Sequence, residues 1–106
     1  MLAKQPSKLV SLQWIVDDQF RYPTSPCIAV NGYRNSKGID DLFSVIVEFI
    51  GVEPQDIPKC TRAQLQALSD NMSDRLPGQG ELFIVTAGTK PIAECRVISD
   101  IDVDEQ

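Results

Sequence analysis

Apolar and polar residues alternate near the start of the chain. The apolar positions of this stretch are Val10, Leu12, Trp14 and Val16. A period of two is typical of a strand that buries one face. Residues 8–20 also fit a helical spacing of three and four, so a helix is the competing interpretation. Their β-branched and aromatic content favours a strand.

Three further segments are predicted to be strands. Residues 27–30 form a short apolar run followed by Asn31-Gly32, a dipeptide typical of two-residue turns. Residues 82–85 are consecutively apolar, which is typical of a strand covered on both faces. A turn longer than two residues, over 87–91, leads to a return strand over 92–99. Strands are therefore expected as pairs at both ends of the chain.

Two helices are predicted between these pairs of strands. The first covers 39–50, where an apolar stripe follows helical spacing. Its members are Ile39, Leu42, Phe43, Ile46, Val47, Phe49 and Ile50. The second covers 61–74, where Thr61 and Gln64 have the spacing of a capping box.

The predicted order, ββααββ, indicates an α+β fold. We expect a single layer of two helices on a mostly antiparallel four-stranded sheet, an order that the β-grasp architecture also has. The length of 106 residues suits one domain spanning 1–106. Its N-terminus, 1–7, is expected to be loose, and 100–106 to form an acidic tail.

Charge and composition argue against nucleic acid and membrane as partners of this protein. Hydrophobic residues make up 42%, enough for a core, and the net charge is -5. The tail carries four acids, and without it 10 bases face 11 acids. A nearly neutral body without basic clusters argues against nucleic-acid binding. No apolar run reaches the length of a membrane span, so no membrane partner is expected.

Nucleophilic and metal-dependent chemistry lacks its usual residues. Histidine is absent, and the three cysteines form no CxxC pair, so we expect no metal and no cofactor. An odd cysteine count without a signal peptide indicates reduced thiols and a cytoplasmic location. Cys27 and Cys95 are expected to be buried as small hydrophobic residues. Cys60 precedes the second predicted helix, whose dipole could lower its pKa.

Aromatic and arginine residues in two loops are the candidate partner-binding residues. They are Phe20, Arg21 and Tyr22 in the first loop, and Tyr33 and Arg34 after the Asn-Gly turn. Tyrosine and arginine are the residue types that most often anchor protein interfaces. Asp17 and Asp18 are paired carboxylates at a strand end, and we expect them to be solvated rather than catalytic.

The sequence favours a non-catalytic protein-interaction module, such as an adaptor, an inhibitor or a small subunit of an assembly. It would bind another protein, or a second copy of itself as a homodimer, through these loops and an exposed strand edge. The run from Val10 to Val16 lacks proline and charge, so it is the edge expected to be paired, either inside the sheet or with a second copy. Alternatively, this run lies centrally in the sheet and only the loops bind. The first alternative is a small-molecule or regulatory domain with a pocket between helix 39–50 and the sheet. A weaker alternative is a histidine-free enzyme using Asp17 or Asp18.

Overall fold

Strands make up most of the regular structure. The computed structural model describes residues 7–101, with the side chains of Asp70 and Ile101 excepted. Its strands are β1 Ser7–Trp14, β2 Cys27–Arg34, β3 Phe43–Phe49, β4 Arg62–Ala67, β5 Leu82–Ala87 and β6 Lys90–Ile101. Three short 3-10 helices are η1 Ile39–Asp41, η2 Pro54–Lys59 and η3 Asp70–Arg75. The described residues contain no helix with the length and apolarity needed to cross a membrane.

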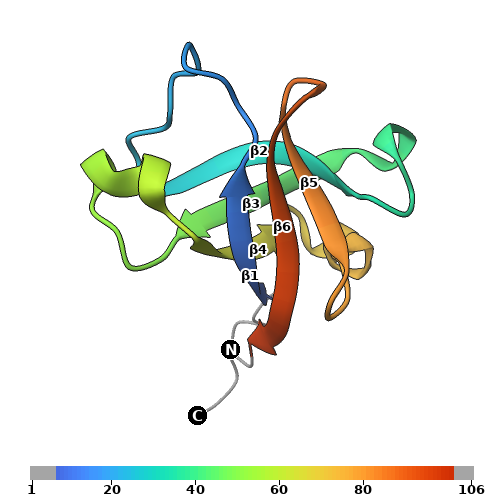
Figure 1. The fold of residues 1–106 in the computed structure, drawn as a ribbon. Coiled ribbons are helices and arrows are strands. Elements are labelled where there is room, and N and C mark those ends of the chain that lie inside the picture. The colour runs from blue at the N-terminus through green and yellow to red at the C-terminus, as the bar shows by residue number, and fades with distance from the viewer. Residues whose placement is uncertain (1–6, 102–106) are drawn as a thin grey trace.

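The six strands form a closed barrel in the order β1-β4-β3-β2-β5-β6, with β6 returning to β1 (Figure 1). Every neighbouring pair is antiparallel. The α+β prediction, with two helices on a four-stranded sheet, is therefore wrong. The expected strand edge is also absent, because β1 pairs with β4 on one side and with β6 on the other.

Most of the first predicted helix, 39–50, is the strand β3, and residues 39–41 form η1. Alternate residues of β3 face the inside and the outside of the barrel. The inward residues of β3 are Phe43, Val45, Val47 and Phe49, all buried. Ile46 is half-buried on the outer side. The outward residues of β3 are Ser44, Ile46 and Glu48, so helical spacing arose because Ile46, with Leu42 and Ile50 beside the strand, supplied apolar residues out of phase with the inward row. The β-branched residues at positions 45–47 fit a pleated strand better than a helix.

The second predicted helix is replaced by β4 and η3. Ala63, Leu65 and Ala67 are all buried, which is the alternation of a strand facing the core. The Thr61–Gln64 capping box does not form, because β4 begins at Arg62. The backbone carbonyl of Thr61 instead accepts a hydrogen bond from the amide of Leu12 at 2.8 Å.

The predicted strands are present, but two turns are misplaced. The strand interpretation of residues 10–16 is confirmed by β1 as far as Trp14, whereas Ile15 and Val16 belong to the following loop. Asn31-Gly32 makes no turn, and β2 continues through it to Arg34. The β5–β6 hairpin has a two-residue turn, Gly88-Thr89, because Ala87 and Lys90 are already paired. Gly88 supplies the positive φ, 64°, that such a tight turn needs.

The barrel interior forms one hydrophobic core with contributions from all six strands. Its largest fully buried side chain is Phe83, and an ideal Cβ at Gly32 would lie 2.3 Å from the Phe83 ring. Gly32 is thus the place where β2 leaves room for this ring. Cys95 is buried as expected, whereas the prediction of a buried Cys27 is wrong.

The lower end of the barrel in Figure 1 carries both chain ends. Asp100 and Ile101, which were assigned to the acidic tail, form the end of β6. Asp100 pairs with Lys8 of β1 at 2.7 Å, and Ser7 already belongs to β1. The rest of the expected loose N-terminus and acidic tail, 1–6 and 102–106, lies outside the described residues.

Candidate functional site

The long connection from β1 to β2, residues 15–26, lies at the end of the barrel opposite the chain ends (Figure 1). It contains no strand or helix, as the two prolines at positions 23 and 26 predict. We call it loop 15–26. It contains three of the predicted partner-binding residues, Phe20, Arg21 and Tyr22.

An aromatic cluster holds this loop against the barrel. Trp14 lies at the centre, with ring centroids 5.0 Å from Tyr22, 5.8 Å from Phe20 and 5.9 Å from Phe49. The rings of Phe20 and Tyr22 also contact each other edge to face at 5.0 Å. Edge-to-face pairs of this kind stabilise a fold beyond their buried area. Phe20 and Tyr22 therefore shape the loop, and of the three predicted residues only Arg21 is exposed.

Two hydrogen bonds further fix the start of the loop. The indole Nε1 of Trp14 donates to the carbonyl of Ile57 at 3.1 Å, which ties the cluster to η2. The carboxylate of Asp17 accepts the backbone N–H of Gln19 at 3.0 Å, the geometry of an Asx turn. Asp17 thus shapes the chain locally, as a turn residue does.

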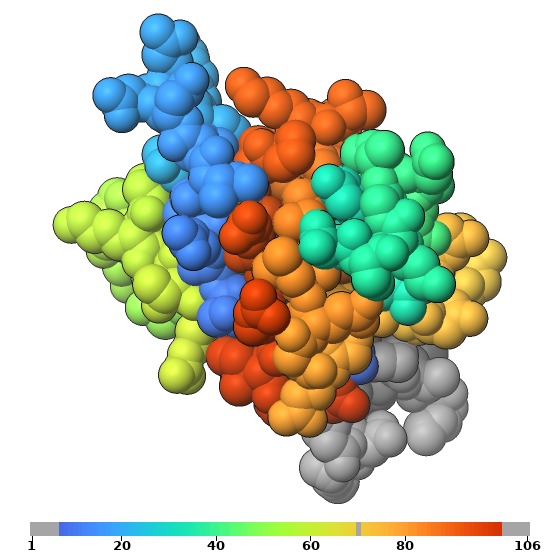
Figure 2. Space-filling model, turned by 45° about the vertical axis from the view of Figure 1, so that its right-hand side comes forward, coloured from blue at the N-terminus to red at the C-terminus, as the bar shows by residue number. Residues whose placement is uncertain are grey.

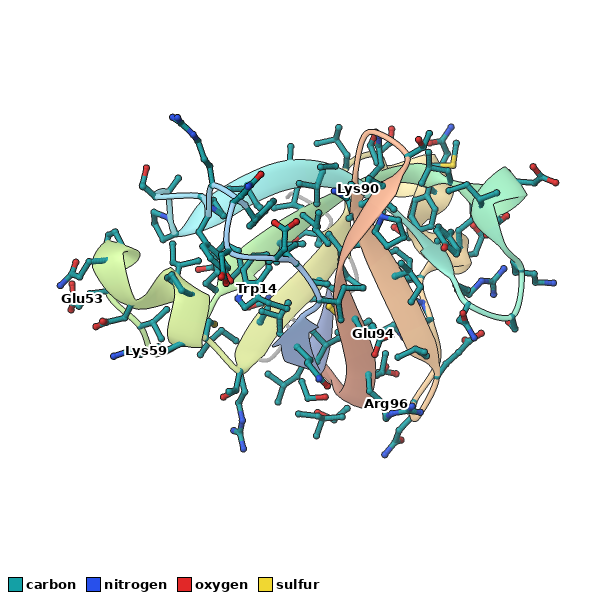
Figure 3. All side chains as sticks on the ribbon, turned by 45° about the horizontal axis from the view of Figure 1, so that its top comes forward. Trp14, Glu53, Lys59, Lys90, Glu94 and Arg96 are labelled. Atoms are coloured by element: carbon teal, nitrogen blue, oxygen red, sulfur yellow. The ribbon has the colours of Figure 1, made fainter. Side chains whose placement is uncertain are left out.

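A groove separates loop 15–26 from the tip of the β5–β6 hairpin, Ala87–Lys90. It has a volume of about 470 Å³. We call it the rim groove; it is lined by Ile15, Val16, Asp17, Gln19, Phe20, Ala87, Lys90 and Ile92. Figure 2 shows the loop and the hairpin tip projecting at the same end of the molecule, and Figure 3 shows Trp14 beneath the loop and Lys90 at the tip.

The rim groove has an apolar floor and a polar border. Val16, Phe20 and Ile92 are buried or half-buried at its base. Its exposed border includes an acid, Asp17, and a base, Lys90. Ile15 adds an apolar side chain that is 41% exposed.

Tyr33 and Arg34 lie at the opposite end of β2 from loop 15–26. At about 3.3 Å per residue, the eight residues of β2 separate them from the loop by more than 20 Å. Arg34 is 3.9 Å from Asp41, which also pairs with Arg75 at 3.3 Å. The structure therefore does not bring the two predicted groups together, and Arg34 takes part in an intramolecular ion-pair network.

Glu81 lies near this network and closes the loop before β5. Its carboxylate accepts the backbone N–H of Gly78 at 2.8 Å and the hydroxyl of Ser36 at 2.9 Å. The Gly78 hydrogen bond is the main reason that the pKa of Glu81 lies below its ordinary value, and the charges of Arg34 and Lys37 add to this effect. Glu81 is a structural carboxylate in this position.

Two of the three cysteines, Cys60 and Cys95, are buried, whereas Cys27 is exposed. Burial raises the pKa of the Cys95 thiol to about 12, so this thiol stays protonated. Cys60 is buried and donates its S–H to the carbonyl of Arg62 at 2.9 Å. The predicted helix start at Cys60 is wrong, since a strand follows. Residues 7–101 hold no group of three or more side chains suited to bind a metal ion.

Sequence reasoning missed several residues of the rim groove. Ala87, Lys90 and Ile92 come from a hairpin more than 60 positions after the loop, and only closure of the barrel brings the two segments together. Ile15 gave a local signal, because it is an aliphatic residue on the otherwise polar face of β1. The predicted pocket between helix 39–50 and the sheet does not exist, because that helix is β3.

The comparisons with known proteins give no relative. The chain matches no family model, no curated protein and no solved structure.

Proposed function

We propose that this protein is a non-catalytic interaction module that binds a partner protein at the rim groove. The observation that carries the proposal is the rim groove itself, in which apolar side chains at the base are surrounded by charged and polar ones. An apolar centre within a polar border is the usual anatomy of a protein interface.

The openness of the groove favours a protein partner over a small molecule. Five of its eight lining residues are exposed: Ile15, Asp17, Gln19, Ala87 and Lys90. Small-molecule sites enclose most of the surface of their ligand. A shallow groove suits a side chain that a larger partner inserts while it covers the border.

The fixed conformation of loop 15–26 supports the same function. The ring contacts of Trp14 with Phe20 and Tyr22 and the turn at Asp17 order the loop before any partner arrives. A preordered loop loses less conformational entropy on binding. The proposed role of Phe20 and Tyr22 is thus to support the surface, while Ile15, Arg21 and Lys90 contact the partner.

Photo-crosslinking in the cell that produces the protein tests this proposal. A photoreactive benzoylphenylalanine would replace Ile15 in one variant and Ile98 in a matched control. The two side chains are equally exposed, at 41% and 40%, but Ile98 lies on β6 away from the rim groove. We expect a protein adduct from position 15 and none from position 98.

The adduct also identifies the kind of partner. An adduct of twice the mass of the chain would identify a second copy, and any other mass a different protein. No adduct from position 15, or equal adducts from both positions, would contradict the proposal.

A further inference from the structure

Strand β2 has a complete neighbour on only one of its sides. It pairs with β3 over Cys27–Gly32, but with β5 only over Asn31–Arg34. The β5–β6 hairpin turns at Gly88-Thr89, so β5 ends before it can reach the first half of β2. Within residues 7–101, Cys27–Val30 therefore have no paired strand on the β5 side.

The backbone of Ala29 points toward this open side. The carbonyl of Pro26 accepts a hydrogen bond from the backbone N–H of Phe49, the last residue of β3. This carbonyl therefore faces β3. In an antiparallel ladder, consecutive residues direct their N–H and C=O to opposite neighbours. Ala29, three residues later, thus directs both groups away from β3.

Cys27 faces the same open side but has a local partner. Its carbonyl accepts the hydroxyl of Ser25 at 3.1 Å. Ala29 is exposed, and it has a donor and an acceptor directed into the space that the next strand of a sheet would occupy. An unpaired donor and acceptor at a strand edge can pair with another chain.

Space for such a chain is present beside Ala29. A hollow of about 290 Å³ adjoins Ala29, and we call it the edge hollow; it is lined by Ala29, Val30, Asn31, Ser44, Leu68, Thr86, Ala87 and Gly88. Ala87 and Gly88 line it from the hairpin tip, on the open side of β2, whereas Ser44 and Leu68 line it from the β3 side. Ala87 lines both the edge hollow and the rim groove, so one partner can contact both sides of the hairpin tip.

We propose that an extended segment of the partner protein adds to β2 as a strand along Cys27–Val30. The N–H and C=O of Ala29 exchange hydrogen bonds with one residue of that segment, which is the recognition mode of β-strand addition. This inference rests on the proposed function and names the form in which the partner binds. The small side chains of Ala29 and Ala87 leave room for an incoming backbone.

Random linear peptides displayed on phage are the probe for this inference, selected on the full chain. The key variant is Ala29→Pro, which removes the edge donor. It leaves the β2–β3 ladder intact, because that N–H does not face β3, and proline is accepted at a strand edge. The matched control, Ala29→Val, enlarges the side chain but keeps the N–H. We expect selected peptides to lose affinity at least about tenfold on Ala29→Pro, and much less on Ala29→Val.

N-methylation of a selected peptide tests the same point with the unchanged protein, and decides the matter if Ala29→Pro fails to fold. In an added strand, every second backbone N–H of the peptide would face β2 and the others would face away. Methyl groups on the nitrogens that face β2 should abolish binding, whereas methyl groups on the other nitrogens should not.

Two results would overturn strand addition. Peptides that bind Ala29→Pro normally but are lost on Lys90→Glu would show that the rim groove binds without the β2 edge, which leaves the proposed function standing. Failure to select any peptide, or binding that neither variant weakens, would count against both proposals.

Discussion

Gly32 lies in the middle of β2 and faces the ring of Phe83 inside the barrel. A Cβ at this position would lie 2.3 and 2.6 Å from two ring carbons and 2.8 Å from the carbonyl of Ile84. These distances are shorter than van der Waals contact, so either the ring or β2 would have to shift. Because Gly32 has no side chain, β2 and β5 can lie close together where the Phe83 ring fills the core.

Gly32→Ala should therefore destabilise the fold by about 1–3 kcal/mol, the usual cost of overpacking a core. Gly78→Ala is the matched control, because the nearest atom to its Cβ is the flexible Glu81 Oε1 at 3.9 Å. Urea unfolding of both variants measures the difference. A cost below about 0.5 kcal/mol for Gly32→Ala would show that the ring has room to move.

Glu81 gives the fold a pH dependence of known sign. Its folded-state pKa is lowered by the Gly78 hydrogen bond, so the unfolded chain binds more protons over the titration range. The carboxylate thus stabilises the fold at neutral pH, and this contribution disappears as the pH falls below the ordinary value of 4.5.

Unfolding experiments on Glu81→Gln at a series of pH values check this expectation. The variant should be less stable than the unchanged protein at neutral pH, and the difference should vanish in acid. Glu53→Gln, at an exposed position before η2, gives the baseline for loss of one surface carboxylate. A difference between the Glu81→Gln and unchanged proteins that grows in acid would contradict the assigned role.

At the scale of elements, β3 distinguishes the barrel from the helical alternative. Phe43 and Ile46 are three positions apart and would share one face of a helix. In the strand they point to opposite sides, with Phe43 buried in the core and Ile46 half-buried outside.

Phe43→Ala should consequently cost about 3–5 kcal/mol of unfolding free energy, because it leaves a core cavity. Ile46→Ala should cost about 1 kcal/mol, because its side chain remains partly in water. Denaturant melts of the two variants give both values. Equal, large costs at the two positions would restore the helix interpretation.

The positions of apolar segments were predictable from the sequence, but the type of two elements was not. Residues 10–16 fitted both a strand and a helix, and it was their β-branched and aromatic content that favoured the strand correctly. In segment 39–50, the alternating inward row of β3 is joined by Leu42, Ile46 and Ile50, which are apolar but out of phase with it, so strand and helix patterns coexist. Asn31-Gly32 was misleading because Gly32 serves core packing against Phe83 rather than a turn.

Only the loop side of the candidate site could be predicted from the sequence. Phe20, Arg21 and Tyr22 drew attention to loop 15–26, where the rim groove lies. Lys90 and Ile92 could not be assigned to the same site, because their proximity depends on closure of the barrel. That closure is set by long-range pairing, which local pattern does not encode.

At the scale of the whole molecule, closure determines where binding can occur. Pairing of β1 with both β4 and β6 leaves no open edge at the strand that the sequence indicated as one. The shorter β5 leaves the first half of β2 without a neighbour, next to the hairpin tip and loop 15–26. Both proposals therefore place the partner at the end of the barrel away from the chain ends.

Amide hydrogen exchange, resolved by residue with NMR, can show whether the sheet closes through β1 and leaves β2 half-paired at Ala29. We predict slow exchange for Val10 and Leu12 of β1, and for Ile28 and Val30, whose amides face β3. The Ala29 amide between them should exchange at least about a hundredfold faster. Slow exchange at Ala29, or fast exchange along β1, would contradict this pairing.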